Sequence, residues 1–405
     1  MRRCLAVLAL LCGSLRAETV LVLPFFNLSK TPNLDWIGES ISESLHDTLS
    51  AEGLLVLDRD DRLEGYRRLS IRSGAELTHA SVLRIGQALD ASTVIYGYYE
   101  VTFPPAVPAA TTPGAPAPAN PAASGSLRVR TRILDLKHLR QVPEFTELRA
   151  LPDLAALEAR VGWQVLQNLD PKAAPKEQEF LRARPPVRLD AVESYVRGLL
   201  APNADQRKQL FTQSARLDEN YSPPRYQLGM AYWMSQDYPV AAGWLARVDR
   251  ANPHYFEAQF FLGLCEYYTG DFASAERAFQ IVAAAVPLNE VFNNLGAAQA
   301  RQSKLPAALS SFQKALDGDD SDPDYHFNLA YLQWKSGKFD DAVKSLRAAL
   351  ERDPSDDEAT SLLGRALKRE NPRPGDPKTE ALERVKTNYE EAAYRQLQAE
   401  LKSAK

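Results

Sequence analysis

The sequence has few of the residues, and none of the short motifs, that mark metal centres or covalent catalysis. Its five histidines stand singly, and none has a second histidine four residues away, the spacing that places two metal ligands on one helix face. The Gly-x-Ser-x-Gly, Gly-x-x-x-x-Gly-Lys and His-Glu-x-x-His motifs are also missing. We therefore predict a protein that is not an enzyme and that requires no cofactor and no metal. The histidines are His46, His79, His138, His254 and His326.

The apolar run at the start of the chain is too short to cross a membrane. It covers residues 5–15, well below the ~20 residues that a spanning helix needs. It follows the basic start Met1–Arg3 and precedes the small residue Ala17, which is the layout of a secretory signal. A buried first helix fits less well, because a strand pattern begins directly after Ala17. We therefore expect residues 1–17 to be a signal peptide and the protein to be exported.

Cysteine is scarce, with three residues in 405. Cleavage after Ala17 removes Cys4 and Cys12, so only Cys265 remains and no intramolecular disulfide can form. Cys265 follows a glycine on a predicted helix, where a small side chain suits close packing, and we predict a buried structural thiol. In a second interpretation, Cys12 carries a lipid that associates the protein with a membrane. Against it, Leu11 is bulkier than the residue that usually precedes a lipidated cysteine.

No excess of positive charge marks a nucleic-acid-binding protein. The chain has 48 Lys and Arg against 52 Asp and Glu, which gives a net charge of −4. Such a balance provides no general attraction to nucleic acid or to an anionic membrane, so we expect no nucleic-acid partner. A hydrophobic content of 45% is ordinary for a globular protein, and 405 residues suffice for two or three domains.

The C-terminal half contains a regular repeat. Gly229, Gly263, Gly296, Ala330 and Gly364 follow one another at gaps of 34, 33, 34 and 34 residues, and a leucine precedes each. Twelve residues after each of the first four comes an alanine, and four residues later a leucine or phenylalanine. The small residue on one helix allows the large residue of the next helix to approach closely. The alanines are Ala241, Ala275, Ala308 and Ala342, and the large residues are Leu245, Phe279, Phe312 and Leu346.

This spacing resembles the tetratricopeptide repeat, a helix-turn-helix unit of about 34 residues. The resemblance implies that residues 187–370 stack into an all-α superhelix with an extended concave face that grips another chain. Turn-like segments at 235–238, 269–272 and 336–339 separate the two helices of their repeats. After the repeats we expect a C-terminal capping helix over residues 377–403.

Strand and helix patterns alternate in the N-terminal half. They indicate a layered α/β domain with a mixed sheet over residues 18–170. Residues 104–125 are almost wholly Pro, Ala, Thr and Gly, so we expect a disordered loop there, and the Pro- and Lys-rich segment 171–186 is the expected linker. The fold class is therefore α+β multidomain, an α/β domain followed by an all-α superhelix. The expected strands are 19–25, 54–57, 92–102, 126–136 and 144–148, and the expected helices are 34–51, 75–89 and 153–169.

Several short segments of this first domain resemble the amino-terminal domain of the TolB type, which is related to domains of the CsgG and FlgO kind. They are Val22–Ser29, Trp36–Ile41, the strand at 91–98 and the strand at 127–136. In bacteria such a domain is often followed by a Tyr-x-x-Gly segment and tetratricopeptide repeats, and Tyr195–Gly198 occupies that place. The resemblance implies a protein of the periplasm or the outer-membrane periphery. No β-propeller follows, so the partner contacts of the TolB propeller do not carry over.

Two charged patterns have ordinary explanations. Arg128, Arg130 and Arg132 alternate with apolar residues, which is typical of the solvated face of a strand and only secondarily of a binding surface. The five aspartates between positions 317 and 324 superficially resemble a calcium loop, but Asp322 stands where that loop has glycine and Asn328 where it has an acidic residue. We expect these aspartates to serve a turn and a helix start.

The resemblance to tetratricopeptide proteins also implies a binding groove. In peptide-binding members the first helix of each repeat lines the concave side, and Asn294 and Asn328 hold the place that hydrogen-bonds an extended backbone. Large aromatics there provide contact area at a small cost in entropy, although part of this set is expected to pack in the core. The Lys and Arg places that hold a C-terminal carboxylate are mostly Glu, Phe or Asn here, so that specificity is not implied. The predicted partner-binding groove comprises Tyr226, Met230, Trp233, Phe260, Leu264, Tyr267, Asn293, Asn294, Arg301, Phe327, Asn328, Tyr331, Trp334 and Lys335.

We therefore predict an exported, non-catalytic scaffold or adaptor that binds a peptide segment or a partner protein in this groove. The alternative is a regulatory or sensory ligand-binding module of a signalling system, which requires that the N-terminal apolar run is not a signal. A third hypothesis is a hydrolase that uses Glu39 and Glu43. Those two residues are four positions apart on a predicted helix, a spacing that is common on a solvated face.

Overall fold

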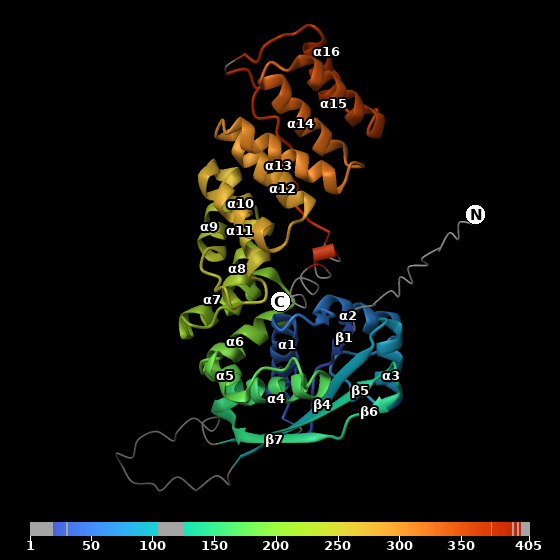
Figure 1. Cartoon of the computed structure of the whole chain (residues 1–405). Helices are drawn as coiled ribbons and strands as arrows, with labels where there is room; N and C mark the ends of the chain where they lie inside the picture. The colour runs from blue at the N-terminus through green and yellow to red at the C-terminus, as the bar shows by residue number, and fades with distance from the viewer. Residues whose placement is uncertain are drawn as a thin grey trace, which may run out of the picture.

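The computed structural model describes residues 19–29, 31–103, 125–373 and 375–390, and in addition residues 393, 394 and 397. The expected signal peptide, with Cys4 and Cys12, and nearly all of the expected Pro/Ala loop lie outside the described residues. The α/β domain forms one end of the molecule, and a stack of helices extends away from it (Figure 1). The N-terminal sheet followed by consecutive helices is the fold class that the sequence predicts.

A mixed sheet forms the centre of the α/β domain. The seven strands run in the order β3-β1-β4-β5-β6, with β2 beside β4 and β7 beside β5. β1 is parallel to β3 and β4, whereas β5 is antiparallel to β4 and β7. The strands are β1 (Thr19–Val22), β2 (Phe26–Asn27), β3 (Leu55–Val56), β4 (Thr93–Thr102), β5 (Ser126–Asp135), β6 (Arg140–Gln141) and β7 (Phe145–Ala150).

Helices cover both faces of this sheet because its central strands carry apolar residues on both sides. α1 (Trp36–Ala51) and α4 (Leu154–Leu169) pack on one face, and α2 (Arg59–Arg68) and α3 (His79–Ala88) pack on the other. The sequence pattern did not indicate α2, whose ten residues are nearly all polar. A capping box between Asp58 and Asp61 stabilises its first turn. Short 3-10 turns lie at Pro32–Leu34 (η1) and Leu151–Asp153 (η3).

The two parts of the molecule share one hydrophobic core. The expected linker 171–186 contains α5 (Glu177–Arg182), whose Phe180 is buried, and the Trp163 indole donates a hydrogen bond to the Pro175 carbonyl at 3.0 Å. The next helix, α6 (Leu189–Leu200), packs against α1, and its Tyr195 and Val196 belong to the same apolar cluster as α1 and α4. The first helix of the stack is therefore anchored to the sheet domain.

Successive helices pair as antiparallel hairpins. A β-carbon added at Gly296 would lie 2.7 Å from Phe312, and one added at Gly263 would lie 2.7 Å from Phe279, so each glycine accommodates the ring of its partner helix. Gly198 stands in the same relation to Phe211 at 2.5 Å. The small-against-large contact that the repeat spacing predicts is thus present. The helices are α6, α7 (Ala204–Leu217), α8 (Pro223–Met234), α9 (Tyr238–Leu245), α10 (Tyr255–Thr269), α11 (Phe272–Ala285), α12 (Asn289–Arg301), α13 (Leu305–Gly318), α14 (Pro323–Lys335), α15 (Phe339–Arg352) and α16 (Asp357–Leu367).

Cys265 lies inside this stack as predicted. Its side chain is buried on α10, and burial raises the pKa of the thiol to about 12. The predicted role as a structural thiol agrees with this placement. Across the described part of the chain, no helix is both long enough and apolar enough to cross a membrane.

The segment after α16 differs from the expectation. A capping helix was expected over 377–403, but residues 377–390 form no helix, and most of 391–403 lies outside the described residues. The chain turns back instead and runs along the stack toward the α/β domain (Figure 1, in red). Ala381 takes a φ of 60°, which interrupts any helix there. The expectation was wrong over 377–390 because the backbone finds its hydrogen-bond partners in the helical stack. We call residues 370–390 the tail.

Candidate functional site

Two asparagines on successive repeats hold the backbone of the tail. Asn328 on α14 donates from Nδ2 to the Arg384 carbonyl at 2.7 Å and accepts from the Arg384 N–H at 2.8 Å. Asn294 on α12 donates to the Lys386 carbonyl at 2.8 Å and accepts from the Lys386 N–H at 2.7 Å. Alternate residues of an extended chain point the same way, which explains why residues 384 and 386 meet the two amides. We call this arrangement the asparagine ladder.

A third asparagine orients the ladder. Asn293 also donates to the Arg384 carbonyl, at 2.8 Å, and its own side-chain oxygen accepts from Asn328 Nδ2 at 2.7 Å. All three side chains belong to fully buried residues. Because a buried amide without partners is costly, the hydrogen bonds to the tail allow these three side chains to be buried.

Further contacts fix the direction of the tail. The Trp334 indole donates to the Glu370 carbonyl at 2.7 Å, and the Tyr331 hydroxyl donates to the Thr379 carbonyl at 3.0 Å. At the other end, Tyr389 meets the ring of Phe260 edge-on, with centroids 5.0 Å apart. The tail therefore runs from α14 past α12 to α10, opposite to the order of the repeats.

One acidic side chain of the tail points into the stack. Glu383 has a fully buried side chain, with Lys335 Nζ at 3.8 Å and Arg301 at 3.9 Å from its carboxylate oxygens. Neither oxygen has a hydrogen-bond partner among the described residues. Burial raises the pKa of Glu383 above its ordinary value of 4.5, and the two nearby cations offset this only in part.

The two basic side chains on either side of Val385 point the other way, into a group of carboxylates. Arg384 contacts Asp356 at 2.6 Å and Glu358 at 2.9 Å, and its guanidinium lies 3.6 Å from the centroid of the Phe327 ring. Burial acts to lower the pKa of Arg384, but the bonds to Asp356 and Glu358 outweigh it and raise that pKa.

The second basic side chain, that of Lys386, contacts the aspartate cluster noted in the sequence. Lys386 Nζ lies 2.7 Å from Asp322 and 2.6 Å from Asp324, and these two partners outweigh burial and raise the pKa of Lys386. Asp322 also caps α14 by accepting from the Asp324 N–H, so the predicted helix-start role holds. The described residues contain no group of His, Cys, Asp or Glu suited to a metal ion.

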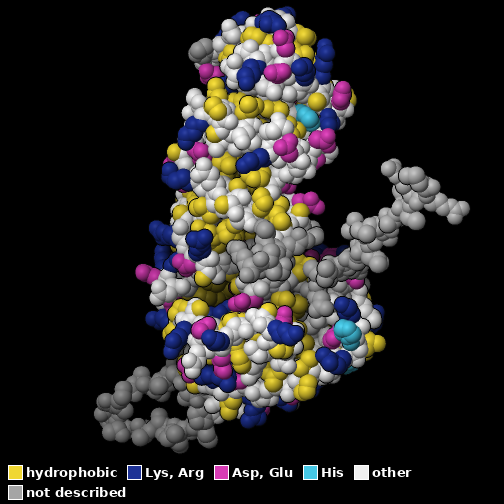
Figure 2. All heavy atoms as spheres, viewed as in Figure 1, with side chains coloured by type: hydrophobic (Ala, Val, Ile, Leu, Met, Phe, Trp, Pro, Cys, Tyr) yellow, Lys and Arg dark blue, Asp and Glu magenta, His cyan; other side chains and the backbone are white. Residues whose placement is uncertain are grey.

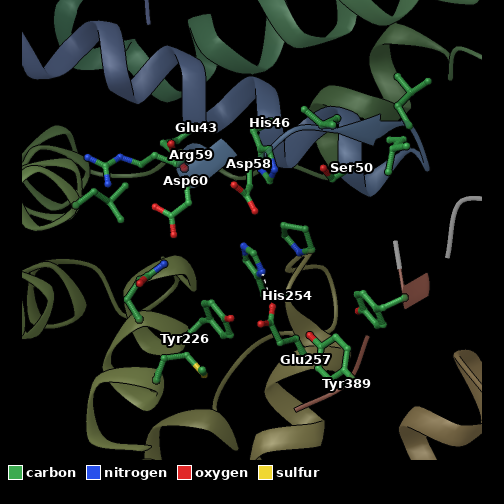
Figure 3. Close-up of a pocket in the computed structure, with 18 of the residues that line it drawn as sticks. Glu43, His46, Ser50, Asp58, Arg59, Asp60, Tyr226, His254, Glu257 and Tyr389 are labelled. Atoms are coloured by element: carbon green, nitrogen blue, oxygen red, sulfur yellow. Dashed lines mark hydrogen bonds and ion pairs between the residues drawn. The ribbon is translucent and has the colours of Figure 1, made fainter. Parts of the chain in front are cut away.

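A cavity of about 420 Å³ lies between the α/β domain and the stack (Figure 3). Glu43, His46 and Arg59 line it from the sheet domain, and His254 and Tyr389 line it from the opposite side (Figure 3). His254 bonds Glu257 at 3.0 Å and stacks on Tyr226 with centroids 4.4 Å apart. Burial acts to lower the pKa of His254, but the bond to Glu257 outweighs it, so the net shift is upward.

The glutamates of the hydrolase hypothesis form ion pairs that connect α1 to α2. Glu39 is bonded to Arg59 at 2.8 Å and also to Arg62, whose guanidinium is buried. Glu43 lies 3.8 Å from Arg62, and burial together with the charge of Glu39 raises the pKa of Glu43. Both carboxylates thus face arginines of the adjoining helix, which accounts for their spacing without catalysis.

Comparison with known proteins identifies the repeats. Residues 262–324 and residues 299–366 each match a family model described as "Tetratricopeptide repeat". The chain contains tetratricopeptide repeats. α12 and α14, which carry the asparagine ladder, both lie within these matched residues, so the tail binds to first helices of tetratricopeptide repeats.

Solved structures similar to part of the chain are distant in sequence. MamA from Desulfovibrio magneticus RS-1, from residue 41 to its end, is 24% identical with a TM-score of 0.36, and the match covers 40% of this chain and 92% of that one. YrrB, described as "a TPR protein with an unusual peptide-binding site", is 17% identical with a TM-score of 0.35, covering 39% and 82%. The Cut9–Hcn1 hetero-tetramer of the APC/C is 20% identical with a TM-score of 0.35, covering 52% and 40%. No curated protein matches the chain.

Most of the predicted groove residues meet at the tail. Of the others, Leu264 and Tyr267 are buried within the tetratricopeptide stack, and Tyr226 and Met230 line the cavity between the domains. Trp233 packs on Phe261 and Tyr238 with ring centroids 5.3 Å away, so it belongs to a separate aromatic cluster. The predicted residues that contact the tail are Phe260, Asn293, Asn294, Arg301, Phe327, Asn328, Tyr331, Trp334 and Lys335.

Sequence reasoning missed the occupant and the acidic side of the groove. Arg384 and Lys386 were assigned to a capping helix, and Asp356 and Glu358 were given no role. The sequence does contain a pattern that could have indicated this contact. Two basic residues stand two positions apart in the tail, and they are complementary in charge to the carboxylates at the starts of α14 and α16. On the face of the molecule that Figure 2 shows, hydrophobic side chains of the stack are interspersed with side chains of both charges.

Proposed function

We propose that the protein is a non-catalytic interaction scaffold whose tetratricopeptide groove binds an extended segment of a partner chain. The observation that carries the proposal is the asparagine ladder, since Asn294 and Asn328 each hold one backbone N–H and one carbonyl of an extended strand. Such contacts recognise main chain and therefore accept segments from other proteins. The matches to tetratricopeptide repeats support the same class of function.

The tail is then an intramolecular competitor. A tethered segment is present at an effective concentration in the millimolar range for a short flexible connection. A partner segment must therefore bind more tightly than the tail or act where the tail has been released. The occupied groove means that the free site of our sequence-based hypothesis exists only after displacement of residues 379–390.

The cellular location is part of the proposal. The signal-like start of the chain and the resemblance of the α/β domain to the TolB, CsgG and FlgO type support export to the periplasm or the outer-membrane periphery, with a lipid on Cys12 as the variant that adds membrane association. The α/β domain, which shares a core with α6, would hold the groove at a fixed orientation and offer a second docking surface. Cell fractionation with N-terminal sequencing tests this, and a cytosolic product that still begins at Met1 contradicts it.

The cavity between the domains favours a second candidate function, a regulatory module that binds a small ligand. Its lining combines Glu43, Arg59 and His254 with the aromatic rings of Tyr226 and Tyr389. Because Tyr389 belongs to the tail, a ligand in this cavity would influence whether the tail stays in the groove. A ligand screen by thermal shift tests this candidate. A compound that still stabilises the Tyr389→Ala variant binds in the cavity without the tail, which distinguishes ligand binding from peptide binding in the groove.

Direct binding of a peptide tests the proposed function. The full-length variant with Arg384→Glu and Lys386→Glu, called here the tail-weakened variant, places acidic side chains beside Asp322, Asp324 and Asp356 and so releases the tail. A fluorescent peptide with the sequence of residues 379–390 should bind this variant at least tenfold more tightly than it binds the natural chain, which corresponds to about 1.4 kcal/mol. Circular dichroism should show unchanged helix content.

The matched control adds Asn294→Ala and Asn328→Ala to the tail-weakened variant. This protein should lose most of its peptide binding, because only Asn293 is then left to bond the backbone of the peptide. Equal binding with and without the two asparagines would remove the basis of the proposed function.

A further inference from the structure

The extended tail divides the groove into two chemically different sides. In a strand, consecutive side chains point to opposite faces. Glu383 and Val385 accordingly point into the stack, where Glu383 lies between Arg301 and Lys335 and Val385 packs against the apolar cluster of α8–α14. Arg384 and Lys386 point to the opposite side, where carboxylates surround them.

We call this opposite side the acidic rim. Its four carboxylates come from the first turns or caps of α14 and α16, and they face only two cations of the tail. Two of them, Asp322 and Asp356, cap these helices through backbone N–H groups. The rim residues are Asp322, Asp324, Asp356 and Glu358.

The charge of the acidic rim determines which peptide segments can bind in the groove. When the tail leaves, four carboxylates remain close together without Arg384 and Lys386, and like charges at such distances repel each other. A segment without cations in register leaves this repulsion uncompensated, whereas an acidic segment increases it. The cost of a wrong occupant is therefore a source of specificity.

Building on the proposed function, we propose that the partner segment is an extended peptide with a basic pair of the form Arg-apolar-Lys, preceded by an acidic or uncharged residue. Arginine suits the first place because its planar group reaches Asp356 and Glu358 together while stacking on Phe327. Lysine suits the second as a point charge between Asp322 and Asp324.

The residue before the pair supplies a second filter. The side chain at position 383 is fully buried between two cations, so a lysine there would place a third positive charge beside them at a buried position. Glutamine is tolerated by contrast, because the carboxylate of Glu383 accepts no hydrogen bond that an uncharged side chain would lose. The raised pKa of Glu383 agrees with this tolerance of a neutral group.

A peptide series on the tail-weakened variant tests the inference. Four fluorescent peptides cover residues 379–390. The first has the natural sequence, and the second carries both Arg384→Glu and Lys386→Glu. The third carries Glu383→Lys, and the fourth carries Glu383→Gln. Fluorescence anisotropy should show that the peptide with Arg384→Glu plus Lys386→Glu and the peptide with Glu383→Lys each bind at least tenfold more weakly than the natural peptide. A loss of this order is expected for like charges in an interface. The Glu383→Gln peptide should bind within about threefold of the natural one, less than the tenfold that corresponds to 1.4 kcal/mol.

A reciprocal exchange of charge sharpens the test. Adding Asp324→Lys and Glu358→Lys to the tail-weakened variant replaces two of the four carboxylates by cations and leaves the capping residues Asp322 and Asp356 in place. This protein should bind the natural peptide more weakly than the tail-weakened variant does. Its own tail, which carries glutamate at positions 384 and 386, should bind the groove again, so hydrogen exchange of residues 379–390 should become slower. These two results support the basic pair.

The outcomes separate the inference from the proposed function. If all four peptides bind the tail-weakened variant within twofold of one another, the groove reads backbone alone, and the basic-pair rule is wrong while the proposed function stands. If the natural peptide itself does not bind, the proposed function fails.

Discussion

At the scale of single residues, the groove depends on primary amides that act as donor and acceptor at once. Asn328 donates to the Arg384 carbonyl and accepts from the Arg384 N–H, as one strand does for another in a sheet. The resemblance to peptide-binding repeats predicts a backbone contact for Asn328, and in the structure this residue contacts the backbone of the tail. Spacing alone could not show that the bound strand belongs to the same chain, because residues 293 and 384 are far apart in sequence.

Removing this amide should release the tail. Asn328→Ala leaves the Arg384 N–H without its partner and removes one of the two donors to the Arg384 carbonyl, at a cost of about 1–3 kcal/mol. Hydrogen exchange of residues 379–390 should therefore accelerate several-fold while exchange in α10–α13 stays unchanged. Asn168→Ala is the control, because Asn168 bonds only within the exposed surface of α4. Unaltered protection of the tail in Asn328→Ala would mean that the ladder does not hold it.

A buried carboxyl in the α/β domain makes stability depend on pH. Burial raises the pKa of Glu158 to about 8, although the Ser40 hydroxyl donates to it at 2.6 Å and partly offsets the shift. Between the ordinary value of 4.5 and about 8, the folded state holds a proton that the unfolded state releases. The stabilisation is therefore complete below pH 4.5 and is lost as the pH rises through about 8, at up to about 1.4 kcal/mol per pH unit.

Glu158→Gln should remove this slope, because glutamine keeps an acceptor for Ser40 and carries no proton to lose. Urea unfolding followed by circular dichroism between pH 5 and 8 should show a flatter profile and a higher stability at pH 8 than in the natural protein. Glu219→Gln, at an exposed position, should leave the natural slope in place. A parallel slope in Glu158→Gln would exclude this carboxyl as the source.

At the scale of elements, the repeat spacing predicted the hairpins because a small residue facing a large one is a local and periodic requirement. The long strands β4 and β5 were also predicted, since they carry long apolar patterns, whereas the two-residue strands β2 and β6 were not. α2 escaped notice because its polar sequence has no apolar period. The tail was misread because a segment such as 380–386 has good helix formers, while its extended form is imposed by distant partners.

Two glycines at equivalent repeat positions should respond in opposite ways to alanine. Gly296→Ala drives a methyl group against the Phe312 ring 2.7 Å away and should destabilise the stack by about 1–3 kcal/mol. Gly364→Ala meets nothing within 4 Å and should stabilise α16 by about 0.5–1 kcal/mol. The free energy of unfolding in urea gives both values, and the same sign for the two variants would refute the interlocking role of Gly296.

At the scale of the whole molecule, three parts converge on the end of the tail. The sheet domain anchors the first hairpin through a shared core, the stack forms the groove, and Tyr389 brings the tail to the cavity between them. The order of these parts was predictable from patterns along the chain. The binding of the tail along the stack was not predictable in this way. It depends on contacts between residues about 50 to 90 positions apart, such as Asn328 with Arg384 and Asn294 with Lys386.

Photo-crosslinking from the groove tests the central claim most directly. Tyr331, whose hydroxyl donates to the Thr379 carbonyl at 3.0 Å, is replaced by benzoylphenylalanine in the natural chain and in the tail-weakened variant. Mass spectrometry should map the crosslink to residues 377–386 of the same molecule in the natural chain, and to the added 379–390 peptide in the tail-weakened variant. Crosslinks that avoid the tail in the first protein and the peptide in the second would contradict a groove built to hold an extended chain.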